Sequence, residues 1–331
     1  MEIGYALAAE DWPPNDLVRL ARRAEESGFG FALVSDHFHP WVDAQGQSPF
    51  VWSVLGGIAQ ATERLRVGTG VTCPLIRMHP AVVAQAAATT AAMMPGRFVL
   101  GLGTGENLNE HVLGDRWPAP DERLEMLEEA IEVIRLLWEG GEQTHRGKHY
   151  TVDHARLYTL PDELPPIVVA AGAPKAARLA GRVADGLANG SPDAAVVEQF
   201  RDAGGSGKPT YGMLHVCVAP SEEEGLETAH KLWANTALPG ELSRELPRPV
   251  HFEDAVKTVR REDVAESVPC GPGPDAQLDA LQAFVDAGYD HAWVHQIGPD
   301  QEAFFRLYEQ EVIPALAGGR QRLVSSGAQP S

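Results

Sequence analysis

Cysteine is scarce in this chain, and basic residues are outnumbered by acidic ones. The three cysteines among 331 residues, Cys73, Cys217 and Cys270, form no C-x-x-C pair, which argues against a disulfide framework and a structural zinc site. Lys and Arg total 27 against 46 Asp and Glu, a net charge of −19. No basic stripe is present to make the phosphate contacts that drive nucleic-acid binding. We therefore expect a small-molecule substrate, no nucleic-acid partner and a reducing, cytoplasmic location.

Long hydrophobic runs are absent as well. No apolar stretch approaches the roughly 18 residues that suggest a membrane span. The chain opens on Glu2-Ile3-Gly4-Tyr5 without the basic and apolar regions of a signal peptide. The sequence thus predicts neither export nor membrane insertion. Hydrophobic residues make up 44% and charged residues 22%, an ordinary globular composition that provides for a sizeable core.

Short apolar runs rich in β-branched residues alternate with longer amphipathic segments, which is the pattern of repeated βα units. The predicted strands cover 3–8, 31–37, 65–72, 98–103, 167–171, 186–189, 211–218 and 291–297. A first predicted helix ends at Gly28, and the others cover 51–61, 81–94, 123–138, 175–183, 194–203, 222–234 and 276–287. The count of eight strands favours a (β/α)8 TIM barrel over a doubly wound open sheet.

The barrel is predicted to form a single domain over residues 1–317. Two excursions, near 140–166 and 235–274, carry turn signals or are rich in Pro and charge, and we interpret them as insertions. Residues 318–331 lack periodicity and are expected to form a flexible tail.

Polar side chains gather where the predicted strands end. They are Asp36, His37 and Trp41 after strand two, Thr72 and Cys73 after strand three, Thr104, Gly105, Glu106 and Asn109 after strand four, and His295 and Gln296 in strand eight. Because the carboxyl ends of barrel strands share one face, these groups are expected to meet there. Acid and base groups so placed suggest proton transfer. Trp41 is either a stacking wall for a substrate or a cap over the core.

Two glycine-containing turns are candidate cofactor sites. Residues 101–106 let backbone amides approach a ligand, but no Gly-Lys-Ser/Thr follows and the spacing departs from G-x-G-x-x-G. At Gly172-Ala173-Pro174 a strand gives way to a helix, whose free amides and dipole favour a phosphate. Ordinary turns have the same glycine pattern, so both interpretations stay open.

The spacing His37-Phe38-His39 is also that of barrel metallohydrolases, which place two imidazoles on one metal. Such sites usually need further ligands on later strands. His295 is available, but the ends of strands four to six offer no other histidine. A metal site is therefore the less favoured alternative, and His39 is interpreted as a loop residue.

Three motifs together resemble the luciferase-like superfamily and, within it, the F420-dependent glucose-6-phosphate dehydrogenase group. They are Asp36-His37-x-x-Pro40-Trp41, Thr104-Gly105-Glu106-x-x-Asn109-Glu110 and Ala170-Ala171-Gly172-x-Pro174. The likeness extends along nearly the whole chain and is densest over residues 1–190. The resemblance implies a (β/α)8 barrel that binds coenzyme F420 and commonly forms a homodimer.

The resemblance also implies which residues contact the coenzyme. Those near the deazaflavin and its ribityl chain would be Asp36, Cys73, Thr104, Gly105 and Asn109. Those at its phosphate end would be Gly172, Ala173, Lys175 and Ala176. A non-proline cis peptide bond would fall at Gly70-Val71.

Carried over residue by residue, the resemblance gives three side chains a role in hydride transfer. His37 would be the general base for the substrate hydroxyl, Glu106 the acid that protonates the reduced ring, and Trp41 the stacking group. The residue chemistry agrees, because an imidazole titrates near neutrality and an enclosed carboxyl can have a raised pKa.

The sequence departs from the sugar-phosphate enzymes where those enzymes use Lys and Arg to hold phosphate. The matching places are Gly190, Asp193, Ser243 and Ser267, and the nearby candidates to replace the missing cations are Arg244, Lys257 and Arg260. Losing several charge-assisted bonds, at about 1.5–3 kcal/mol each, would nearly abolish phosphate recognition.

We therefore predict an F420-dependent oxidoreductase that acts on an unphosphorylated alcohol, sugar or hydroxylated metabolite, in a direction the sequence leaves open. The alternatives are a sugar-6-phosphate dehydrogenase with a rearranged phosphate site, an FMN-dependent luciferase-like monooxygenase, the metal-dependent hydrolase and a cofactor-binding protein without catalysis.

Overall fold

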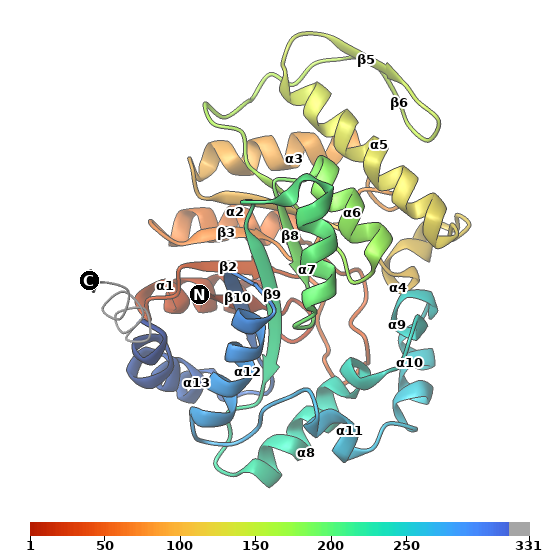
Figure 1. The fold of residues 1–331 in the computed structure, drawn as a ribbon. Helices are drawn as coiled ribbons and strands as arrows, with labels where there is room; N and C mark the ends of the chain where they lie inside the picture. Colours follow the sequence, from red (N-terminus) through yellow and green to blue (C-terminus); the bar gives the residue numbers. More distant parts are fainter. Residues whose placement is uncertain (318–331) are drawn as a thin grey trace, which may run out of the picture.

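Eight parallel strands close into a barrel, and helices surround it (Figure 1). The computed structural model describes residues 1–317. Around the barrel the strands follow the order β1-β10-β9-β8-β7-β4-β3-β2. Their bounds are β1 (Glu2–Leu7), β2 (Phe31–Val34), β3 (Arg66–Thr69), β4 (Phe98–Leu102), β7 (Ile167–Ala170), β8 (Gly186–Asn189), β9 (Thr210–Val216) and β10 (His291–Gln296). The predicted (β/α)8 barrel is confirmed.

Helices of different lengths follow the strands and form part of the second excursion. Their bounds are α1 (Pro14–Glu26), α2 (Val51–Ala61), α3 (Pro80–Met93), α4 (Asn107–Glu110), α5 (Pro120–Trp138), α6 (Pro174–Val183), α7 (Ala194–Phe200), α8 (Glu222–Trp233), α9 (Leu242–Glu245), α10 (Pro249–Val256), α11 (Arg261–Ala265), α12 (Asp275–Asp286) and α13 (Gln301–Leu307). In α1, Pro14 stands at the first position and Leu17, Ala21 and Ala24 form the buried stripe. Gly28, with φ at +85°, then turns the chain.

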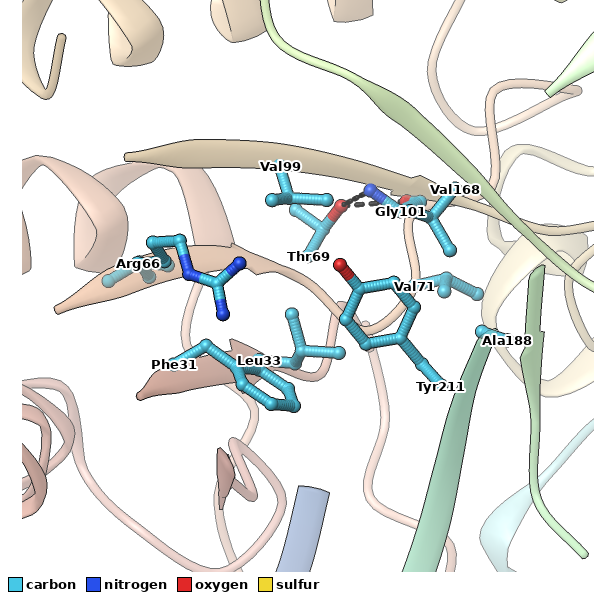
Figure 2. A pocket seen from close by; sticks show the side chains of 11 residues that line it. Phe31, Leu33, Arg66, Thr69, Val71, Val99, Gly101, Val168, Ala188 and Tyr211 are labelled. Carbon is cyan, nitrogen blue, oxygen red and sulfur yellow. Dashed lines mark hydrogen bonds between the residues drawn. The ribbon is translucent and has the colours of Figure 1, made fainter. Parts of the chain in front are cut away.

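The amino-terminal half of the barrel interior is filled by side chains. Phe31 and Tyr211 lie there with ring centroids 5.6 Å apart, and Leu33 and Val168 pack beside them. The space left between these residues, seen in Figure 2, is about 10 Å³. That is about enough for one water molecule. Within the barrel formed by the described residues, the larger space lies toward the carboxyl ends of the strands.

Both predicted excursions carry secondary structure of their own. The first contains the antiparallel hairpin of β5 (Gln143–Arg146) and β6 (Thr151–Ala155), which extends beyond α5 in Figure 1. The second contains the short helices α9, α10 and α11. Phe252 of α10 is fully buried with its ring centroid 5.2 Å from that of Trp41. The second excursion is thereby tied to the carboxyl face of the barrel.

Two predicted strands end three residues earlier than expected. β2 stops at Val34 rather than at residue 37, because the chain leaves the sheet at Ser35, whose hydroxyl accepts a hydrogen bond from the N–H of Ala9 at 2.8 Å. β3 stops at Thr69 rather than at residue 72. The Gly70-Val71 peptide bond that follows is cis, as the resemblance implied.

The sequence analysis assigned no element after the eighth predicted strand, which is β10. The structure has α13 and the π-helical turn Tyr308–Val312 there. The rings of Phe304 and Tyr308 from this segment lie with their centroids 4.2 Å apart, and each stacks on Phe29. The π turn interrupts the 3.6-residue period, which weakens the helical signal in the sequence. The predicted tail, 318–331, lies outside the described residues.

None of the helices in the described part of the chain combines the length and apolar character needed to cross a membrane.

Candidate active site

A cavity of about 650 Å³ opens at the carboxyl ends of the barrel strands. His37, Trp41 and Glu106, the three side chains expected to act in hydride transfer, all line it. The cis peptide residues Gly70 and Val71 form part of the same wall. The structure therefore brings together the predicted acid, base and aromatic groups, which come from different segments of the chain.

His37 is held at both ring nitrogens. Its Nδ1 lies 3.2 Å from the carbonyl oxygen of His39 and must donate, since a carbonyl only accepts. Its Nε2 lies 3.4 Å from Oε1 of Glu10, whose side chain is 3% exposed. The Ser35 hydroxyl donates to the other Glu10 oxygen at 2.6 Å. His37 Nε2 is therefore the nitrogen available for proton transfer, next to a buried carboxyl.

Glu10 was missed by the sequence analysis, although, like the residues that were found, it follows the carboxyl end of a barrel strand. It follows strand β1 as Asp36 follows β2. The expected set named no residue after strand one, so this carboxyl, which also lines the cavity, went unassigned.

Trp41 is fixed by contacts on both sides of its ring. Its centroid lies 4.9 Å from that of His37, with the planes at 60°, and 5.2 Å from that of Phe252, with the planes at 73°. The backbone N–H of Trp41 donates to Oε1 of Gln45 at 2.8 Å. The indole is thus both a wall of the cavity and packed against the core.

Asn109 joins the loop after β2 to the loop after β4. Its Oδ1 accepts hydrogen bonds from the backbone N–H groups of Phe38 at 2.8 Å and His39 at 3.3 Å. Its Nδ2 donates to Oε2 of Glu106 at 3.3 Å. Asn109 is buried, and its contacts position both the loop that carries His37 and the Glu106 carboxyl.

Asp36 is engaged by the protein itself. Its Oδ2 accepts from the Thr72 hydroxyl at 2.7 Å and its Oδ1 from Nη2 of Arg77 at 2.8 Å. The backbone N–H of Arg77 also donates to Glu110 at 2.8 Å. Burial raises the pKa of the Glu110 carboxyl, and Arg77 opposes that shift. These groups form a buried charge cluster beneath the loop that carries His37.

Cys73 lies beside this cluster and against Gly105. Burial and the nearby Glu110 charge raise the pKa of its thiol, so it is a protonated packing residue rather than a nucleophile. Gly105 has φ at +71°, and a Cβ there would lie 2.6 Å from the Cys73 sulfur. Thr104 precedes Gly105 in the same partly exposed turn.

The predicted phosphate end lies at the start of α6. Gly172, Ala173 and Lys175 are exposed, Ala176 is partly exposed, and no side chain caps the helix. The Lys175 ammonium pairs with Asp121 at 2.8 Å. Nη2 of Arg244 lies 3.3 Å from the position that a Cβ on Gly172 would occupy. Uncapped amides beside a guanidinium group fit an anion.

The places expected to bind a substrate phosphate face the cavity without a cation. Gly190, Ser243 and Ser267 line it, whereas Asp193 caps α7, where its Oδ1 accepts from the N–H of Ala195 at 2.9 Å. Among the described residues, no Lys or Arg lines the cavity. Its charged side chains are Glu10, Glu106 and Glu266.

The three candidate replacement cations lie elsewhere. Lys257 pairs with Asp254 at 2.7 Å, and Arg260 pairs with Asp263 at 2.5 Å, both with exposed side chains. Arg244 lies beside Gly172 instead. None of these three side chains therefore supplies the cavity wall with a cation in place of the missing phosphate-binding residues.

His37 and His39 do not face a common point. His39 Nδ1 lies 3.0 Å from the carbonyl oxygen of Leu108, and its ring stacks on His111 with centroids 5.7 Å apart. Within residues 1–317 no group of three or more His, Cys, Asp or Glu side chains is arranged to hold a metal ion.

The eighth predicted strand, which is β10, contributes to the site differently from expectation. His295 is 1% exposed and lies behind His215 of the neighbouring strand β9, which lines the cavity. Gln296 is also buried and bonds to the backbone of Val218 at 2.9 Å. His215, like Trp233, was not among the predicted site residues.

A closed parallel barrel with imidazole, carboxyl and indole side chains gathered at the carboxyl ends of its strands has the architecture of an enzyme barrel. The family described as luciferase-like monooxygenase matches residues 1–291, and the chain belongs to this luciferase-like family. The F420-dependent glucose-6-phosphate dehydrogenase of Microbacterium testaceum is 36% identical over 328 residues, covering 96% of this chain and 97% of that protein. The enzyme of the same name from Nocardia farcinica is 35% identical over 329 residues, covering 96% and 98%.

Solved structures agree with this assignment. An F420-dependent secondary alcohol dehydrogenase in complex with an F420–acetone adduct is 31% identical, with a TM-score of 0.89 and coverage of 95% of this chain and 98% of that one. The F420-dependent tetrahydromethanopterin reductase of Methanopyrus kandleri, 22% identical with a TM-score of 0.78 over 95% and 99%, shares the fold. The family that the sequence motifs indicated is confirmed.

Proposed function

We propose that this chain is an F420-dependent oxidoreductase that transfers a hydride between the deazaflavin and the carbinol or carbonyl carbon of an unphosphorylated alcohol, sugar or hydroxylated metabolite. One observation carries the choice of substrate. The cavity that holds His37, Trp41 and Glu106 has three carboxyl groups on its wall and, among the described residues, no Lys or Arg.

The relatives support the F420-dependent class. Proteins 34–36% identical over nearly their full length are named F420-dependent glucose-6-phosphate dehydrogenases. The solved enzyme at 31% identity, named an F420-dependent secondary alcohol dehydrogenase, was captured with an F420–acetone adduct. These names favour F420 over FMN, and the acetone adduct of the second protein supports a small unphosphorylated ketone or alcohol as substrate.

The residues present fit the coenzyme. The cavity gives the ring system space beside the Gly70-Val71 backbone, and Gly105 leaves its turn free of a side chain. Gly172, Ala173 and the uncapped start of α6, with Arg244 nearby, suit the phosphate end. When bound, the deazaflavin supplies a carbon that accepts or donates a hydride. The roles assigned to Asp36, Cys73, Thr104, Asn109, Lys175 and Ala176 stay predictions.

His37 acts as the proton acceptor for the substrate hydroxyl. Because its Nδ1–H is held by the His39 carbonyl, the incoming proton binds at Nε2. The imidazolium that results lies with Nε2 3.4 Å from Oε1 of Glu10, an oxygen placed to accept the new N–H. Glu106 is the second proton-transfer group, with Oε2 fixed by the Asn109 amide.

The relatives' names also make glucose 6-phosphate a second candidate substrate. A phosphate dianion in this cavity would meet carboxyl groups rather than the cations that form charge-assisted bonds of about 1.5–3 kcal/mol each. We therefore rank a phosphorylated substrate below a neutral hydroxylated one. The cytoplasmic location, homodimeric state and single-domain organisation likewise remain predictions.

Coenzyme binding and substrate choice are tested together. The protein is titrated separately with F420 and FMN, and the F420-loaded protein is assayed for coenzyme reduction with propan-2-ol, cyclohexanol, D-glucose and glucose 6-phosphate. We expect micromolar or tighter F420 binding and turnover of an unphosphorylated compound. Binding of FMN alone would contradict the cofactor, and robust glucose 6-phosphate oxidation would contradict the substrate class.

The proposed proton-transfer roles need their own variants. His37→Ala and Glu106→Gln are each expected to lower kcat about 10²–10⁴-fold. His291→Gln is the control, because His291 pairs with Glu2 at the opposite end of the barrel. Unchanged turnover in the first two variants would refute the assigned roles.

A further inference from the structure

Two histidines on adjacent strands form a direct imidazole–imidazole hydrogen bond. His215 of β9 and His295 of β10 are paired in register, so their side chains point to the same face of the barrel wall. Their Nδ1 atoms lie 2.9 Å apart. His295 is 1% exposed, whereas His215 is partly exposed and lines the cavity. Of these two rings, that of His215 reaches the cavity and that of His295 does not.

His295, the buried member of this pair, is hydrogen-bonded to a carboxyl group. His295 Nε2 lies 3.3 Å from Oδ2 of Asp11, and the Trp233 indole N–H donates to Asp11 at 3.0 and 3.2 Å. Trp233 also lines the cavity, with its centroid 5.4 Å from that of His215. Asp11, His295 and His215 thus form a hydrogen-bonded row that ends at the cavity wall.

The order of the row fixes the proton positions. An ionised Asp11 can only accept, so His295 Nε2 carries a proton and, in the neutral ring, its Nδ1 is a lone pair. His215 Nδ1 must then carry the proton between the rings, which leaves His215 Nε2 as an acceptor. Burial, and next the proximity of His295, lower the pKa of His215 to about 3, so its ring is neutral near pH 7. In the described part of the chain, His215 Nε2 has no hydrogen-bond partner from the protein.

We propose that His215 Nε2 is a fixed acceptor for a second substrate hydroxyl, distinct from the one that is oxidised, and that the substrates are therefore diols, polyols or free sugars rather than simple secondary alcohols. This inference rests on the proposed function. His37, the proposed base, and the Glu10 carboxyl beside it already occupy one part of the cavity wall. A second acceptor elsewhere, backed by the flat ring of Trp233, suits a ligand with several O–H donors and an apolar C–H face.

His295 and Asp11 act through His215 and are positioning residues. An Asp11→Asn variant separates this role from packing. The Asn carbonyl would accept the Trp233 N–H and its amide would donate to His295 Nε2, so the row would reverse and His215 Nε2 would become a donor. The substitution preserves shape while changing the direction of every hydrogen bond in the row.

The first test reads the tautomer directly. ¹⁵N-histidine spectra of the free protein should show His215 protonated at Nδ1 and unprotonated at Nε2, and Asp11→Asn should reverse this. Adding D-glucose or trans-cyclohexane-1,2-diol should shift the His215 Nε2 resonance, whereas cyclohexanol should not. A protonated Nε2 in the unmodified chain, or no response to either polyhydroxyl probe, would overturn the inference.

The second test uses the F420-loaded protein. His215→Phe should raise KM for trans-cyclohexane-1,2-diol or D-glucose at least tenfold more than it raises KM for cyclohexanol. His291→Gln, on the neighbouring strand β10 and paired with the Glu2 carboxylate, is the matched control. Equal effects on the monol and the diol would overturn the inference.

The two proposals fail in different ways. If F420 does not bind, the proposed function fails, and the ¹⁵N spectra of the free protein still decide the role of His215. If F420 binds and alcohols are oxidised but His215→Phe does not discriminate between monol and diol, only the present inference fails.

Discussion

The side-chain oxygen of Asn109 accepts a hydrogen bond from the backbone N–H of Phe38 at 2.8 Å. This bond ties the loop after β4 to the loop that carries His37. Through its amide nitrogen, Asn109 also contacts Glu106. A residue expected to contact the coenzyme thus also holds the proposed base and acid in place.

Asn109→Ala should destabilise the protein by about 1–3 kcal/mol, because it leaves the buried N–H groups of Phe38 and His39 without an acceptor. Asn109→Asp keeps the accepting oxygen and should recover part of the loss. Urea unfolding measures both. Asn107→Ala is the control, since it removes an exposed bond to the Glu245 carbonyl. Equal losses in the two alanine variants would contradict the role of Asn109.

Arg77→Leu should cost about 3–5 kcal/mol of unfolding free energy, because Asp36 and Glu110 would lose the cation between them. The Arg77 side chain is 8% exposed, so water cannot replace the contact. Arg260→Leu removes an exposed pair with Asp263 and should have no measurable effect. The prediction is refuted if denaturant midpoints of the two variants coincide.

His215 should make the protein less stable as the pH falls. Burial lowers its pKa from 6.5 to about 3, so between those values the unfolded chain binds more protons than the folded chain. Stability is therefore lost progressively from about pH 6.5 downward. The groups next to it are His295 and, beyond that ring, Asp11. The His215→Gln variant has no imidazole to protonate at this position and does not lose this stability. As the pH is lowered from about 7 to about 4.5, its unfolding free energy should therefore rise relative to that of the parent protein. A difference that is independent of pH would contradict this.

Adding a cation to the cavity should improve recognition of a sugar phosphate. Ser267→Lys places an ammonium group on a wall that, in the described chain, has no Lys or Arg. One charge-assisted bond of about 1.5–3 kcal/mol corresponds to a decrease of about 10–100-fold in KM or Ki for glucose 6-phosphate. Ser206→Lys, at an exposed position outside the cavity, is the control. The same gain in both variants would indicate a general charge effect.

The fold was predictable because its signals are local. The alternation of β-branched runs with amphipathic segments gave the barrel, and Gly28 and Pro174 marked helix boundaries where the structure has them. The ends of β2 and β3 were placed too late, since hydrogen bonds from distant segments decide where a strand leaves the sheet. The helix α13 was missed because an aromatic cluster from both ends of the chain stabilises it.

The site was predictable in part. His37, Trp41 and Glu106 follow predicted strands and do line one cavity, while their chemical roles stay predictions. Glu10 followed the same rule and was overlooked. Lys257 and Arg260 lie near the cavity-lining residues in sequence, but their side chains turn to the surface and pair with neighbouring carboxylates.

The sequence by itself determined the barrel, the family and the segments that reach its carboxyl face, because hydrophobic periodicity and strand-end motifs are properties of neighbouring residues. Only the tertiary structure decided that His215 rather than His295 lines the cavity and that Asp11 lies behind both rings. It also decided that the cavity wall is acidic. Hydrogen-bond direction and local charge depend on groups more than 200 residues apart, such as Asp11 and Trp233, and no local pattern records which of them meet.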